Sequence, residues 1–138
     1  MQVKLYNVDN WVDTWYDTDM QIVFVKWFNF TSGIHVRKSC EAQLEALKKF
    51  KATIIIADAS QAIGMPYPED QDWFESTLYP ESKRLGLKLI ISIMPKNTIA
   101  KIGARNWNNS GTDSGLNYIE VDSMDKALLY LKTQNISG

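Results

Sequence analysis

The chain has 138 residues, of which 45% are hydrophobic and 22% are charged, a mixture typical of a globular domain rather than a disordered segment. Its formal net charge of −1 and its pI near 5.8 argue against binding to nucleic acid or to an anionic membrane. Cys40 is the only cysteine, which excludes an internal disulfide and any metal site built from several thiolates.

The sequence predicts a single domain over residues 1–138, located in the cytoplasm. The segment Met1–Asn7 lacks the apolar region of a secretory signal. The longest apolar runs, around Ile54 and over Leu89–Met94, fall far below the roughly 18 residues that a membrane span requires. We therefore expect no membrane insertion.

The first predicted elements form a β-hairpin. Val12–Tyr16 and Gln21–Phe28 are rich in β-branched and aromatic residues, and Asp17–Met20 supplies the turn between them. An earlier edge strand is expected over Val3–Val8.

A helix and a buried strand follow the hairpin. Thr31 or Ser32 is the expected N-cap of a helix that runs to about Phe50 and carries Cys40 on its apolar stripe. His35 is expected to face solvent on this helix. The apolar run Ile54–Ala57 is typical of a buried central strand.

A second helix is predicted to begin near Pro68, with Glu69, Asp70 and Asp72 at its positive end. Pro80 lies deep in the helical pattern and should kink the helix or split it in two.

The last third of the chain predicts two more strands and two more helices. The expected elements are a strand over Lys88–Met94, a short helix carrying Ile99, Ile102 and Trp107, a loop over Asn108–Gly115, a strand over Asn117–Val121, and a helix capped by Asp122 or Ser123 with Ala127, Leu128 and Leu131 inside. Strands that alternate with helices after a hairpin predict an α/β fold. We expect a mixed sheet of four to five strands with about four helices.

This order of elements resembles the SpoIIAA-like fold of the STAS (sulphate transporter and anti-sigma factor antagonist) domains, and in particular small bacterial STAS-like proteins. The residues that carry the resemblance are Val25–Ser32, Ile55–Ser60, Pro68–Trp73 and the pair Tyr79–Pro80. The resemblance covers most of the chain from about Val12 and implies a non-enzymatic module that acts by docking partners.

In anti-sigma factor antagonists, a serine in an Asp-Ser-Ser-Gly-like motif at a helix start is phosphorylated to release the partner. The matching region here is Pro68-Glu69-Asp70, so the phosphoserine switch is not carried over. The acids at this helix start would also repel an added phosphate. Ser60 lies in the same loop but aligns with the earlier Asp-x-Ser element.

The sequence contains no set of residues that indicates catalysis. A nucleophilic Ser60 would need a base within reach, and His35, the only histidine, opens a different helix. Asp58 is placed like the phosphoacceptor of a response-regulator receiver, but nothing after Trp27 supplies the acid pair that would hold Mg²⁺. We therefore expect Asp58 to accept hydrogen bonds in an Asx-type turn, and we expect no metal and no cofactor.

The aromatic residues outnumber the inner positions that the predicted elements offer. They gather in the first thirty residues and in the second helix, so some are expected to be exposed on a dimer surface or in an apolar groove. The first hypothesis is a regulatory or scaffolding module, a homodimer that binds a protein partner through the edge containing Asp58, Ser60, Glu69, Asp70 and Trp73. The alternative is a carrier of a small apolar or lipid-like ligand.

Overall fold

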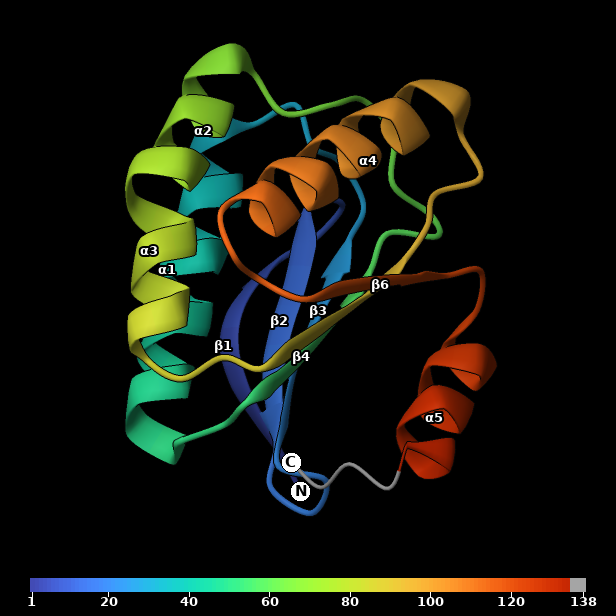
Figure 1. Cartoon of the computed structure of the whole chain (residues 1–138). Helices are drawn as coiled ribbons and strands as arrows, with labels where there is room; N and C mark the ends of the chain where they lie inside the picture. Colours follow the sequence, from blue (N-terminus) through green and yellow to red (C-terminus); the bar gives the residue numbers. More distant parts are fainter. Residues whose placement is uncertain (135–138) are drawn as a thin grey trace.

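A computed structural model of the chain describes residues 1–134 and contains a six-stranded mixed sheet whose strand order follows the chain order (Figure 1). The strands are β1 (Gln2–Val8), β2 (Val12–Asp17), β3 (Ile22–Trp27), β4 (Ile54–Asp58), β5 (Leu89–Ile93) and β6 (Tyr118–Val121). The predicted α/β class and mixed sheet are confirmed. The predicted count of four to five strands is too low, because β1 is a full strand at the edge of the sheet.

The sheet changes from antiparallel to parallel at β3. β1, β2 and β3 pair antiparallel, and β3 to β6 pair in parallel. The turn after β2 forms because Asp17 Oδ1 accepts hydrogen bonds from the main-chain nitrogens of Asp19 and Met20, at 2.9 Å each. The expected hairpin and its turn residues are therefore confirmed.

Helices cover both faces of the sheet (Figure 1). They are α1 (Gly33–Phe50), the continuous segment of α2 (Pro68–Trp73), the π-helix η1 (Phe74–Leu78) and α3 (Tyr79–Arg84), then α4 (Thr98–Asp113) and α5 (Met124–Thr133). All but α5 pack on the face that carries Val23, Val25 and Trp27. α5 covers the opposite face, where Phe24 and Ile56 lie. Among residues 1–134, no helix is long and apolar enough to cross a membrane.

The cap of α1 and its apolar stripe agree with the sequence. Ser32 is the N-cap and accepts a hydrogen bond from the His35 main-chain nitrogen, and Cys40 is buried in the stripe. The prediction that the His35 side chain faces solvent is wrong. Its Nδ1 lies 2.8 Å from the Tyr6 hydroxyl oxygen, and its ring centroid lies 5.3 Å from that of Trp11, so His35 joins α1 to the sheet edge.

Pro80 is predicted to kink the second helix or to split it in two, but the helical segment continues through it with a change of hydrogen-bond pattern. Proline lacks an N–H and its ring displaces the carbonyl group one turn earlier. The chain widens to a π-helix just before it, where the Tyr79 main-chain nitrogen donates to the Phe74 oxygen five residues back. The helical direction is kept, and Tyr79 remains fully buried.

α4 contradicts one prediction. The segment Asn108–Gly115 is expected to be a loop, but the helix continues to Asp113. Of the residues that the sequence places on this helix, Ile99 and Ile102 are 53% and 49% exposed, whereas Trp107 is buried. The small residues Ala100, Gly103 and Ala104 face the core together with Trp107.

The final helix follows its prediction in part. Ser123 is its N-cap, and Ala127 and Leu131 are buried, whereas Leu128 is 37% exposed. A helix of this length can bury only a narrow stripe against the sheet, and Leu128 lies outside it.

Candidate partner-binding site

The loop after β4 is held by an Asx turn. Asp58 Oδ1 accepts hydrogen bonds from the Ser60 main-chain nitrogen at 2.9 Å and from Ser60 Oγ at 2.7 Å. This is the local role that the sequence predicts for Asp58. Ser60 therefore donates its hydroxyl hydrogen to a carboxylate within its own turn, while the His35 ring lies against Tyr6 and Trp11. The structure does not bring Ser60 and His35 together as a nucleophile and base.

The loop after β3 repeats this geometry. Asn29 Oδ1 accepts hydrogen bonds from the main-chain nitrogen and Oγ of Thr31, at 2.9 and 2.6 Å. The two turns are joined because the Ile63 main chain pairs with the loop after β3, donating to Phe28 and accepting from Phe30. Both Asx turns therefore form one rigid edge at the carboxyl ends of β3 and β4. The repeated polar-x-hydroxyl pattern is the sequence signal that could have revealed the pairing.

Asp70 stabilises this edge from inside. Its side chain is 2% exposed, with Oδ1 at 3.2 Å from Arg37 Nε and Oδ2 at 3.3 Å from the Tyr67 main-chain nitrogen. It therefore caps the start of α2 and joins this helix to α1. Its burial leaves the carboxylate little area to offer a partner.

The other two predicted site residues on α2, Glu69 and Trp73, both contact Arg37 of α1. Glu69 is exposed, and its main-chain oxygen accepts a hydrogen bond from Arg37 at 3.1 Å. Trp73 is half-buried, with the Arg37 guanidinium 5.8 Å from the centre of its ring. Arg37, which the sequence did not single out, thus connects Glu69, Asp70 and Trp73.

A set of exposed apolar side chains lies beside these turns, and we call it the exit patch. Its members are Ile63, Tyr67, Ile99 and Ile102, which are 51%, 46%, 53% and 49% exposed. They come from the loop between β4 and α2 and from the first two turns of α4, at the upper edge in Figure 1. Exposed apolar residues that gather at one edge are typical of a binding surface.

Two glycines bring the parts of the exit patch together. Gly64 has a φ of +71°, a conformation that favours glycine, and it turns the loop directly after Ile63. Gly103 lets α4 rest on the loop, because a Cβ atom at this position would lie 2.6 Å from Met65 Cβ and 3.2 Å from Pro66 Cδ. The sequence places Ile99 and Ile102 on a helix but does not show that this helix packs beside Ile63 and Tyr67, so the patch could not be predicted from it.

Opposite charges lie at the two ends of the exit patch. The exposed acids Glu69 and Asp72 belong to α2 at one end, and the exposed cations Lys96 and Lys101 lie at the start of α4 at the other. Figure 1 shows these helix starts on opposite sides of the upper edge, with the loop from β4 passing between them.

The aromatic residues do not form the exposed surplus that the sequence predicts. Most pack inside; for example, the Phe74 and Trp107 rings stack with their centroids 4.0 Å apart. Tyr67 is the one aromatic side chain among the large exposed hydrophobic residues of the described chain. Within residues 1–134, no group of three or more His, Cys, Asp or Glu side chains is arranged to hold a metal ion.

Comparison of the chain with protein-family models, with curated proteins and with solved structures gives no match. The class of protein is therefore argued from the sheet, the strand-exit edge and the exit patch alone.

Proposed function

We propose that the chain is a non-enzymatic docking module of the SpoIIAA-like (STAS) kind and that the exit patch is its binding surface. The observation that carries this proposal is the exposure of about half of each patch side chain at the edge where parallel strands end. Open α/β sheets commonly bind their ligands outside this edge. The module works without a phosphoserine switch, because Ser60 is held by Asp58 and the next helix begins with acids.

The occupant that the charges favour is a second copy of the chain. In a two-fold symmetric interface each surface meets itself in reverse, so the acidic end of one patch faces the basic end of the other. Glu69 and Asp72 of one protomer then approach Lys96 and Lys101 of its partner, while the isoleucines of the patch meet in the middle. A homodimer built in this way presents two modules in a fixed arrangement, as a scaffold requires.

Charge reversal tests this arrangement. One variant carries Glu69→Lys with Asp72→Lys, and the other carries Lys96→Glu with Lys101→Glu. Each alone should be monomeric in sedimentation velocity at concentrations where the wild type is dimeric, because like charges then face each other. An equimolar mixture of the two should form heterodimers. The proposal fails if the wild type is monomeric at millimolar concentration, or if both variants dimerise as the wild type does.

An apolar substitution provides an independent arm. Ile102→Lys places a charge in the centre of the patch and should abolish dimerisation, and Leu129→Lys is its matched control. Leu129 is 57% exposed on α5, which packs on the opposite face of the sheet. Equal effects of the two substitutions would remove the exit patch as the interface.

A further inference from the structure

A cavity of about 50 Å³ lies between the sheet and helices α1, α3 and α4, and it is partly open rather than fully enclosed. This volume is several times the roughly 10–15 Å³ that a single water molecule requires. Ile55 and Ala57 of β4 and Ala59 directly after it are among the lining residues, and Ala57 is itself only partly buried.

Small side chains beside Trp107 leave this space open. Ala57 and Ala59 face it from the sheet side and Ala104 from α4, where Trp107 also lines it. Larger aliphatic side chains at these positions would occupy part of this volume. The space therefore depends on the small size of the alanine side chains.

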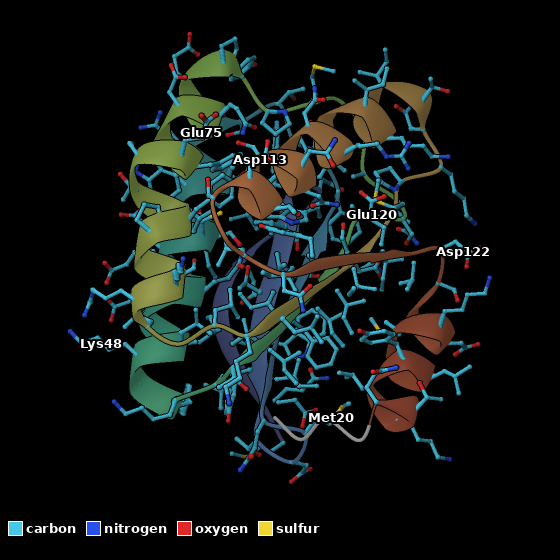
Figure 2. All side chains as sticks on the ribbon, viewed as in Figure 1. Met20, Lys48, Glu75, Asp113, Glu120 and Asp122 are labelled. Atoms are coloured by element: carbon cyan, nitrogen blue, oxygen red, sulfur yellow. The ribbon has the colours of Figure 1, made fainter. Side chains whose placement is uncertain are left out.

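Two buried amide side chains line the cavity and leave hydrogen-bond acceptors open. Asn108 uses its amide nitrogen to donate to Ser92 Oγ at 2.9 Å and to Glu120 at 3.0 Å, and Gln43 uses its own to donate to Ser39 at 3.2 Å. Figure 2 shows Glu120 beside α4, where it holds the Asn108 amide in place. The hydrogen bonds found among the described residues use neither carbonyl oxygen of these two amides.

These two carbonyl oxygens border open space. Among buried side-chain polar atoms of residues 1–134, the one that is fully enclosed without a partner is Trp15 Nε1. The amide oxygens of Gln43 and Asn108, at residues that are 7% and 6% exposed, are therefore accessible, and the cavity is the open space that both residues line. An accessible carbonyl oxygen accepts a hydrogen bond from the molecule beside it, so the cavity is suited to a guest that supplies a donor.

The lining also limits the guest. None of the described residues that line the cavity carries a charge, so an ionic guest would lose its hydration without compensation. The volume is far below the roughly 300–1,000 Å³ of pockets for drug-sized ligands, so the guest that fits this cavity as it stands is small. The polar groups distinguish this cavity from purely apolar ones, which remain empty.

We propose that this cavity is a binding site for a small neutral molecule with a short apolar body and one hydrogen-bond donor, the class of short-chain alcohols and primary amides. The donor faces the amide oxygens of Asn108 and Gln43, and the apolar body lies along Ala57, Ala59 and Ala104. None of the exit-patch residues lines this site, so its occupancy does not depend on the docking function.

Titration of the ¹⁵N-labelled chain with 2-propanol and with acetone tests the site, because the two have the same heavy-atom skeleton and only the alcohol donates. We expect saturable shifts of the main-chain amide resonances of Ala57, Ala59, Ser92 and Ala104 with 2-propanol at millimolar concentration. Acetone should bind at least about fivefold more weakly, since it leaves the carbonyl acceptors unpaired.

Filling the cavity provides the matched variant. Ala104→Leu should weaken 2-propanol binding about tenfold or more, whereas Ala42→Leu on α1, which does not line the cavity, should leave it unchanged. If Ala104→Leu fails to give a dispersed spectrum, Ala57→Val in β4 decides by the same criterion. Three outcomes would each overturn the proposal. 2-Propanol and acetone could bind equally well, or 2-propanol could still bind the Ala104→Leu variant as it binds the wild type. The wild type could also show no saturable shifts, which would mean that the cavity holds water alone.

Discussion

The phenolic hydroxyl group of Tyr79 donates a hydrogen bond of 2.7 Å to the main-chain oxygen of Trp107, across the interior between the start of α3 and α4. Tyr79 is fully buried, and the Phe74 ring stacks on Trp107 beside it. The widened helical turn before Pro80 therefore sets the position of α4, which carries half of the exit patch.

Tyr79→Phe should lower the free energy of unfolding by about 1 kcal/mol, the usual net contribution of one buried hydrogen bond. The ring and its packing are retained, so the change isolates the hydroxyl group. Urea unfolding monitored by circular dichroism measures the loss. Tyr130→Phe, on a half-buried ring of α5, is the control and should change stability by less than about 0.5 kcal/mol. A similar loss in both variants would contradict the assigned role.

Asp70→Ala should destabilise the chain by about 2–3 kcal/mol. It removes the cap of the Tyr67 main-chain nitrogen and leaves Arg37 without its buried carboxylate. Glu75→Ala is the matched control, because Glu75 is an exposed acid in the same continuous helical segment, and we expect a change within about 0.5 kcal/mol. Chemical denaturation of both variants measures the free energies of unfolding. Equal decreases would mean that the buried hydrogen bonds of Asp70 do not stabilise the chain more than an exposed acid does.

Gly103→Ala should destabilise the chain by about 1–2 kcal/mol, although alanine is favoured over glycine in a helix by about 1 kcal/mol. The new Cβ atom would lie 2.6 Å from Met65 Cβ, so α4 and the loop beneath it must separate. Thermal unfolding gives the sign of the change, and Asn106→Ala at an exposed position of α4 should be neutral or stabilising. A stabilised Gly103→Ala variant would show that the close approach is not required.

Stability should fall as the pH rises above about 8.5, where a cysteine thiol titrates in the unfolded chain. Burial raises the pKa of the Cys40 thiol and of the Tyr79 and Tyr118 hydroxyl groups in the folded state. The unfolded chain then loses these protons first, so each group removes up to about 1.4 kcal/mol per pH unit above its unfolded pKa.

Denaturant titrations at neutral and alkaline pH measure this slope. Cys40→Ala should be less stable than the wild type at neutral pH but should lack the first part of the decline, between about pH 8.5 and 10, because the tyrosines titrate only near about 10. A wild-type stability that stays constant to about pH 10 would contradict the burial of the Cys40 thiol.

The sequence predicts correctly the elements in which each residue suits both the local backbone conformation and its buried or exposed position. The alternation in β3 is one example, because Ile22 and Phe24 do face one core while Val23 and Val25 face the other. Asp58 is another, since its turn depends only on residues within the same loop. In such segments local preference and tertiary packing favour the same structure.

The sequence failed where small or polar residues serve a tertiary contact. Gly111 and its neighbours resemble a loop, but a Cβ at Gly111 would lie 2.3 Å from the Tyr118 ring, so glycine permits α4 to contact β6. Asn108 continues the helix because its amide bonds Ser92 and Glu120. The candidate site and the cavity both depend on such contacts, which no local pattern contains.

The strand order of the sheet has a consequence for how the chain acquires its structure. Each strand pairs only with its neighbours in sequence, from β1 through β6, so the sheet can grow from the amino-terminal hairpin by adding one strand at a time. The antiparallel hairpins join adjacent segments, whereas each parallel pair must close a connection that contains a helix. The hairpins, whose pairing is local, can therefore form first and serve as the template for the parallel strands that follow.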